Sequence, residues 1–120
     1  MMNQELKIIT REILFSFWKV HILHHAGKGP VVGQWMLQEL RRHGYEVSPG
    51  TMYPLLQRME RNGWLRCVVA AKGGVHARKS YYLTGKGRDV LEIVLAQLEE
   101  LRSEVGRKKK EGSNRRGVAL

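Results

Sequence analysis

Apolar residues recur at three- and four-residue steps through the first part of the chain, the spacing of an amphipathic helix. The longest such stretch covers residues 5–25. Its apolar positions are Leu6, Ile9, Ile13, Phe17 and Val20, widened by Leu14, Trp18 and Ile22. Gly27 and Pro30 interrupt the pattern, since both residues oppose helix continuation. The same spacing predicts a second helix over residues 33–43, with Gly44 as its C-terminal cap.

A third helix begins at a clear start signal. Ser48 is an N-cap type of residue, and Pro49 follows it at the first helical position. One apolar face continues up to Asn62 and Gly63, and its members are Met52, Leu55, Leu56 and Met59. The opposite face of this helix is polar.

Beyond Gly63 the pattern changes to two runs of strand-forming residues. Residues 64–69 read Trp-Leu-Arg-Cys-Val-Val, and residues 78–83 read Arg-Lys-Ser-Tyr-Tyr-Leu. The connection over residues 70–77 contains two adjacent glycines and basic side chains. These features predict one β-hairpin with an extended basic tip.

A last helix is predicted from Thr84, a plain N-cap candidate, to about Gly106. Five of its apolar positions are spaced 3, 4, 3 and 4 residues apart, the a/d pattern of a coiled-coil seam. They are Leu91, Val94, Leu98, Leu101 and Val105. Such a short seam is marginal alone, so we expect a dimer interface between this helix and the first helix of a partner, with Leu14 and Trp18. Residues 107–120 lack periodic apolar positions and are predicted to be a basic disordered tail.

Helix, helix, helix, strand, basic loop, strand, helix is the order of a winged helix-turn-helix domain with an added C-terminal helix. The predicted fold class is therefore mainly α with a small β-hairpin. Residues 1–85 would form the winged helix-turn-helix domain, 86–106 the dimerisation helix and 107–120 the tail.

The charge of the chain is unevenly distributed. Lys and Arg number 21 against 11 Asp and Glu, a net charge of +10. Residues 28–88 carry eleven bases and three acids, residues 89–106 one base and five acids, and residues 107–120 six bases and one acid. Local basic charge favours a polyanionic partner, and double-stranded DNA is the first candidate. The acidic last helix is expected to face away from it.

Composition excludes several other classes of protein. The length suits one domain, and a single cysteine excludes an intramolecular disulfide. No run of about 18 apolar residues exists, so we expect a cytoplasmic protein that does not enter a membrane. The sequence has no Gly-rich phosphate loop, nucleophile elbow or apolar pair of carboxylates, so neither an enzyme nor a cofactor is expected.

The polar face of the third helix carries the main candidates for DNA contact. Hydroxyls and free backbone N–H groups at a helix N-terminus bind phosphate, and Gln and Arg side chains can read adenine and guanine. The helix offers Ser48, Thr51, Tyr53, Gln57, Arg58 and Arg61. The hairpin adds Lys72, His76, Arg78 and Lys79 as candidate contacts to the neighbouring DNA backbone.

Two runs of residues carry a resemblance to a known family. Ser-Pro-Gly-Thr-Met-Tyr-Pro-Leu-Leu at 48–56, followed by Arg-Lys-Ser-Tyr-Tyr-Leu-Thr-Gly-Lys-Gly at 78–87, resembles the signature of the PadR family of bacterial and archaeal transcriptional regulators. The resemblance covers roughly residues 10–105, and the single C-terminal helix resembles the short subgroup. It implies a homodimer that binds a palindromic operator, usually as a repressor and often released by a small molecule.

The resemblance also implies roles for single residues. Tyr53 matches a family tyrosine that faces the phosphate backbone. Thr51, Pro54, Gln57 and Arg58 fall on the recognition helix, and Arg78 and Lys79 on the basic start of the second wing strand. Residues 32–36 depart from the common His-Gly-Tyr-Glu-Ile, and Gln34 is the candidate substitute for its tyrosine. The last helix lacks the tryptophan that lines a drug-binding pore in some short relatives.

Some residues have two interpretations. His21, His24 and His25 could share a metal, but a helix C-terminus also favours histidine and no carboxylate or cysteine is near in sequence, so no metal site is expected. Trp18 and Trp35 either belong to the core or line a cavity for a small hydrophobic or aromatic effector.

Three functions remain open at the level of sequence. The chain could be a dimeric DNA-binding repressor, an interaction module that binds RNA or a protein through the winged fold, or a dimer dominated by a ligand-sensing pocket. Preference for one DNA duplex would separate the first from the second, and displacement by a hydrophobic ligand would support the third. Fold alone does not choose among them.

Overall fold

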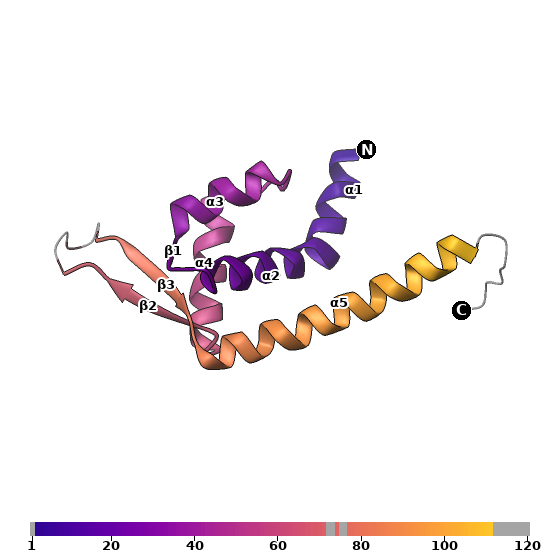
Figure 1. The fold of residues 1–120 in the computed structure, drawn as a ribbon. Coiled ribbons are helices and arrows are strands. Elements are labelled where there is room, and N and C mark those ends of the chain that lie inside the picture. The colour runs from indigo at the N-terminus through magenta and orange to yellow at the C-terminus, as the bar shows by residue number, and fades with distance from the viewer. Residues whose placement is uncertain (1, 72–73, 75–76, 112–120) are drawn as a thin grey trace.

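The computed structural model describes residues 2–71, 74 and 77–111 (Figure 1). The helices are α1 (Met2–Ile9), α2 (Phe15–Ala26), α3 (Gly33–Arg42), α4 (Pro49–Arg61) and α5 (Gly85–Glu111), and a π-helical segment, η1 (Thr10–Leu14), joins α1 to α2. The strands are β1 (Val31–Val32), β2 (Leu65–Val69) and β3 (Lys79–Leu83). The predicted fold class, mainly α with a small β-wing and a long C-terminal helix, is confirmed.

The helix predicted over residues 5–25 is not one regular helix. The backbone is π-helical through η1, and α1 turns away from the axis of α2 there (Figure 1). A π turn holds one more residue than an α turn, so it rotates the apolar stripe between the two helices. Trp18, Ile22, Leu23 and Ala26 face the core, whereas Ile13 is 54% exposed. The other half of the wide predicted stripe is thus left on the surface.

Helices α2, α3 and α4 surround one hydrophobic core. From α3 come Met36, Leu37 and Leu40, and from α4 the predicted face of Met52, Leu55, Leu56 and Met59. The sheet adds Val31, Leu65 and Tyr81. Burial of this apolar face is worth about 1.5–3 kcal/mol per large side chain. It fixes α4 so that its polar face points to solvent.

The sheet has three strands in the order β1-β3-β2, and both pairings are antiparallel. The predicted hairpin pairs Leu65 with Leu83 and Val69 with Lys79. Strand β1 was not predicted, because two valines are too few to show an alternating pattern. It pairs Val31 with Tyr81 and leads directly into α3, so the sheet holds the start of α3 beside β3.

Thr84 joins the hairpin to the last helix. Its hydroxyl oxygen accepts a hydrogen bond from the Gly87 N–H at 2.9 Å, which confirms the predicted N-cap. The same hydroxyl donates to the Gly63 carbonyl at 2.6 Å, just after α4. A Cβ atom at Gly87 would overlap the Trp64 carbonyl. The end of α4 and the start of α5 are therefore fixed to each other.

Helix α5 is longer than predicted. It ends at Glu111 rather than Gly106, so the expectation of disorder is wrong for residues 107–111, and residues 112–120 lie outside the described chain. The added residues read Arg-Lys-Lys-Lys-Glu, all good helix formers. The first half of α5 runs along α2, and the second half projects beyond the body of the protein (Figure 1). Among the described helices, none is long and apolar enough to cross a membrane.

Candidate nucleic-acid interface

The exposed face of α4 carries the residues predicted to contact DNA. Tyr53, Pro54, Gln57, Arg58 and Arg61 are all exposed, and Thr51 is half-buried in the first turn. The buried methionines and leucines of the same helix hold these side chains outward. The face therefore offers an aromatic ring, an amide and two guanidinium groups to a ligand in solvent.

Ser48 starts α4 in a way that sequence did not predict in full. The residue has extended backbone angles, and its carbonyl accepts hydrogen bonds from the N–H groups of Thr51 and Met52 at 3.0 and 2.9 Å. Its hydroxyl lies 3.4 Å from the Thr51 hydroxyl instead of capping a backbone N–H. The exposed Ser48 side chain therefore lies at the N-terminus of α4, where phosphate is favoured.

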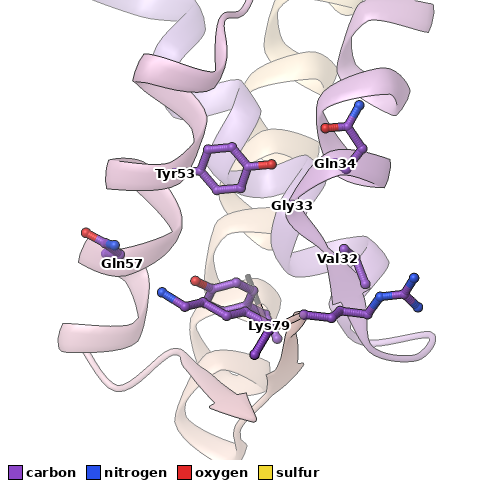
Figure 2. A pocket seen from close by; sticks show the side chains of 9 residues that line it. Val32, Gly33, Gln34, Tyr53, Gln57 and Lys79 are labelled. Carbon is purple, nitrogen blue, oxygen red and sulfur yellow. The ribbon is translucent and has the colours of Figure 1, made fainter. Parts of the chain in front are cut away.

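A groove runs beside α4 and collects predicted residues from three elements (Figure 2). It has a volume of about 430 Å³ and lies between the start of α3, the exposed face of α4 and the start of β3. Gln34, Tyr53, Gln57, Arg78 and Lys79 all line it. Residues that are up to 45 positions apart in the chain (34 to 79) therefore form one surface.

Gly33 controls the shape of this groove and was not predicted as a site residue. A Cβ atom at Gly33 would overlap Cε1 of the Tyr53 ring, and would lie 3.1 and 3.2 Å from two further ring atoms. The Cε1 edge of the ring therefore points at the backbone at the start of α3, with Gln34 nearby (Figure 2). The sequence signal for this contact was only a glycine at a helix start.

Tyr81 forms the floor of the groove. It is 2% exposed, whereas the neighbouring Tyr82 is half-buried, which shows which of the two adjacent tyrosines belongs to the core. Burial, and then the nearby Cys67 thiol, raises the pKa of Tyr81 to about 12. The phenol therefore stays neutral under ordinary conditions. Tyr82 instead packs under the Arg66 guanidinium, with 4.9 Å from Cζ to the ring centre.

The wing presents basic side chains at its described positions. Arg66 on β2 and Arg78 and Lys79 at the start of β3 are exposed. The Ala70 N–H donates to the Arg78 carbonyl at 2.9 Å, so the hairpin pairing continues past the strand ends. The other two predicted wing contacts, Lys72 and His76, lie outside the described residues.

The residues predicted for a dimer interface divide into two groups. Leu91 packs on the core of its own chain, and Leu14, Val94 and Leu98 are half-buried. Leu101 and Val105, in the projecting half of α5, are 56% and 54% exposed. The seam is thus partly covered within one chain and open toward its C-terminal end.

The two candidate effector-binding tryptophans lie in different surroundings. Trp18 is 2% exposed and packs against Phe15 and Tyr45, so it belongs to the core of its own chain rather than to an open dimer surface. It also lines a cavity of about 680 Å³, and its indole N–H has no hydrogen-bond partner among the described residues. Trp35 is 49% exposed and meets the edge of the His25 ring.

The comparisons with known proteins agree with this architecture. The model of the "Transcriptional regulator PadR-like family" matches residues 22–93. The chain belongs to this family. It is therefore a DNA-binding transcriptional regulator and not an enzyme.

Individual relatives of the PadR-like family match most of the chain. Transcriptional regulator Rv3488 of Mycobacterium tuberculosis (strain ATCC 25618 / H37Rv) is 46% identical over 95 residues, which cover 79% of this chain and 88% of the relative. A PadR-family regulator of Eggerthella lenta DSM 2243 has a solved structure similar to this one, with a TM-score of 0.68 and 28% identity, covering 92% of this chain and 99% of the other. A PadR-like regulator of Bacillus cereus strain ATCC 14579 gives a TM-score of 0.67 at 27% identity, covering 82% and 93%.

Proposed function

We propose that the chain is a repressor that binds a palindromic operator as a homodimer. The observation that carries the proposal is the exposed polar face of α4 and its groove, where Gln34, Tyr53, Gln57, Arg78 and Lys79 meet. In this proposal α4 enters the major groove, Gln57 and Arg58 contact base edges, and the wing contacts the backbone beside it. Such a regulator works in the cytoplasm, beside the DNA it controls.

The dimer is proposed to form through the projecting half of α5. Leu101 and Val105 are exposed there, and Ile13 and Phe17 are exposed along η1 and α2. Packing these two surfaces between copies would bury both and follows the predicted heptad spacing. A twofold dimer then presents two α4 helices to major grooves about 34 Å apart. Residues 89–106 carry five acids and one base, so α5 is suited to lie away from the phosphates.

A small-molecule effector that releases the operator is part of the proposal. The cavity beside Trp18 has about 680 Å³, a volume typical of ligand sites. Its lining joins Leu6 and Phe15 of the N-terminal helices to Thr51 in the first turn of α4. A hydrophobic or aromatic ligand there would touch both the dimerisation region and the proposed DNA-contacting helix. Displacement of operator DNA by such a ligand, weakened in Trp18→Ala, tests this part of the proposal.

The decisive experiment is selection from a random duplex library with the purified protein at about 150 mM salt, where unspecific phosphate binding is reduced. The expected result is a palindrome whose half-sites lie about one helical turn apart. Retained DNA without a shared motif would contradict the operator proposal. It would favour the alternative of a winged-helix module that binds RNA or a protein partner.

A further inference from the structure

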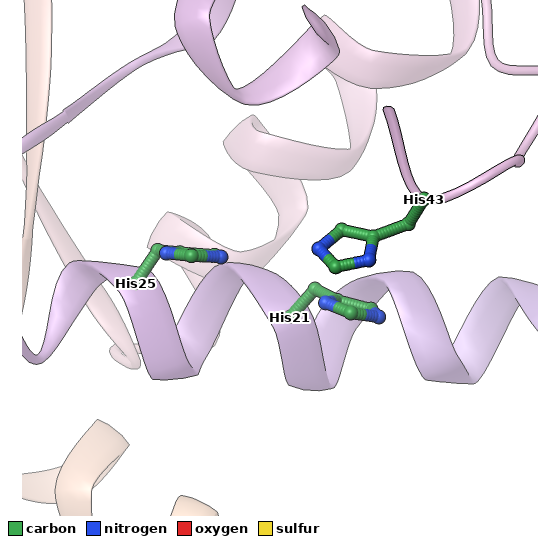
Figure 3. Close-up of side chains that lie close together, drawn as sticks. All are labelled: His21, His25 and His43. Atoms are coloured by element: carbon green, nitrogen blue, oxygen red, sulfur yellow. The ribbon is translucent and has the colours of Figure 1, made fainter. Parts of the chain in front are cut away.

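Three histidines from two parts of the chain meet beside α2 (Figure 3). His21 and His25 lie one turn apart on α2, and His43 directly follows α3. One ring nitrogen from each lies within 4.8 Å of the others. The sequence had grouped His21 with His24 and His25, but His24 is exposed and its place in the cluster is taken by His43.

Glu39 of α3 supplies the carboxylate that was not visible near these histidines in the sequence. Its Oε2 atom lies 3.4 Å from His25 Nε2 and 3.1 Å from His43 Nε2. In a tetrahedral zinc site, with bonds of about 2.0–2.2 Å, neighbouring ligand atoms lie about 3.3–3.6 Å apart. Two ligand pairs in this cluster are therefore already near that spacing.

The charges around the cluster suit a metal ion. Imidazole binds metal in its neutral form, and burial, followed by the neighbouring histidines, lowers the pKa of His21 and of His25. Hydrogen bonds from Arg42 hold the pKa of Glu39 at about 2, so its carboxylate stays charged. Arg42 donates from Nη2 to Oε2 at 2.7 Å and from Nε to Oε1 at 3.1 Å. The Arg42 side chain is 67% exposed, so it can give up its hydrogen bond to Glu39 Oε2 when a cation binds there and keep its hydrogen bond to Oε1.

We propose that His21, His25, His43 and Glu39 form a binding site for a divalent transition-metal ion, with zinc as the best fit. Three imidazoles and one carboxylate are a ligand set that zinc accepts in tetrahedral geometry. The three imidazole nitrogens, now up to 4.8 Å apart, must move closer to bind one ion, which requires the rings to rotate. His43 is exposed and follows the end of its helix, so its ring can turn, at the cost of changing its present contact with the His21 ring, whose centre is 4.8 Å away.

A metal at this site would connect α2 to the end of α3. The segment after His43 is the turn that leads into α4, so the ion would fix α2 to the point where the turn of the helix-turn-helix unit begins. None of the four proposed ligands lies on α4 or lines the groove beside it. Metal binding can therefore be tested without DNA, and its failure would leave the proposed operator binding untouched.

The test is a titration of metal-free full-length protein with zinc alone, in competition with a chromophoric chelator. We expect one zinc per chain. His21→Ala and His43→Ala should weaken binding by more than about 100-fold, and Glu39→Gln by about 10- to 100-fold. His24→Ala is the matched control, because it removes a histidine from the same helix outside the cluster, and it should bind zinc as tightly as the wild type. Cobalt added in place of zinc should give the visible absorption of a tetrahedral ion.

Two results would overturn the proposal. One is absence of a one-to-one zinc complex in the wild-type protein. The other is equal affinity in wild type and His43→Ala, or a loss confined to His24→Ala, which would indicate unspecific binding by surface histidines. Circular dichroism checks that each variant is folded. If His21→Ala fails to fold, His43→Ala still decides, since His43 is exposed.

Discussion

At the scale of single residues, the proposed DNA-binding surface depends on one contact between two helices. The ring of Tyr53 occupies the space that a side chain at Gly33 would fill. Tyr53 is 39% exposed, so the contact orients a ring that can also move outward. A tyrosine held in this way loses less side-chain entropy when it binds a phosphate, because the ring is already ordered.

Gly33→Ala should therefore separate DNA binding from stability. The new methyl group would displace the Tyr53 ring, and we expect specific DNA affinity to fall by about 1–3 kcal/mol, the usual worth of such a contact. Stability should change little, since alanine is the better helix former by up to about 1 kcal/mol. Fluorescence anisotropy with operator DNA and thermal unfolding measure the two effects.

Gly85→Ala is the matched control for this substitution. Gly85 also begins a helix, and a Cβ atom there would meet no atom of the described structure within 4 Å. The control should bind DNA like the wild type. Equal DNA affinity in both variants would show that the position of the Tyr53 ring does not matter for binding.

Arg58 should contribute to sequence-specific DNA binding, and Lys79 to binding of any duplex. Arg58→Ala, on the exposed face of α4, is expected to cost about 1–3 kcal/mol on the operator and to relax base preference at one position. Lys79→Ala, at the wing, should weaken binding to the operator and to a random duplex equally. It should also make the slope of log affinity against log salt less steep by about 1. Salt titrations on both duplexes distinguish these results. A uniform loss in Arg58→Ala would mean that Arg58 contacts only phosphate.

The sequence could predict which residues of α4 are exposed, but not which residues of other helices lie next to them. The apolar spacing of α4 leaves Gln57 and Arg58 on the polar side, and both are exposed in the structure. The contact of Gly33 with Tyr53, and of Glu39 with His43 and His25, depends on how separate helices pack. A helical period carries no information about distance between elements, so these partners appear only in the folded chain.

At the scale of elements, α5 has two different environments along its length. Leu91 packs on the core of its own chain, whereas Leu101 and Val105 are exposed. The heptad pattern predicted which residues form the seam, but not how far along α5 the same chain covers them. It also could not show the π-helical break at η1, because Ile9, Ile13 and Phe17 keep four-residue steps through that segment.

Leu101→Asp should convert the proposed dimer into a monomer. Leu101 is 56% exposed, so the change leaves the core of one chain intact, but it would bury a charge in the proposed seam. Sedimentation velocity should show a lower mass and operator affinity should fall, because two linked half-sites bind more tightly than one. Leu98 is a weaker choice for this test, since it is half-buried within its own chain.

Ser103→Asp provides the control for charge on the same helix. Ser103 is exposed and falls at the f position of the heptad, opposite the seam that contains Leu101. It should remain a dimer. Unchanged dimerisation in Leu101→Asp as well would place the interface elsewhere on the protein.

At the scale of the whole molecule, charge is separated along the fold. Residues 28–88, which contain α3, α4 and the wing, carry eleven bases and three acids, and residues 89–106 of α5 carry one base and five acids. In Figure 1 α5 lies on the far side of α2 from α3. A polyanion is therefore attracted to one side of the protein and repelled from the other, which favours one orientation at encounter.

Residues 107–120 restore a net positive charge beyond the acidic part of α5, with six bases and one acid. Truncation after Glu111 removes Arg115 and Arg116. For each phosphate that these arginines no longer neutralise, the negative slope of log affinity against log salt should become less steep by about 0.9. Because phosphates carry no sequence information, operator and random duplex should be affected equally, and the specificity ratio should not change. A full-length Arg115→Gln, Arg116→Gln variant isolates charge from chain length and should match the truncation. An unchanged slope in both variants would show that these arginines do not bind DNA phosphates, and that the basic surface of residues 28–88 accounts for the salt dependence alone.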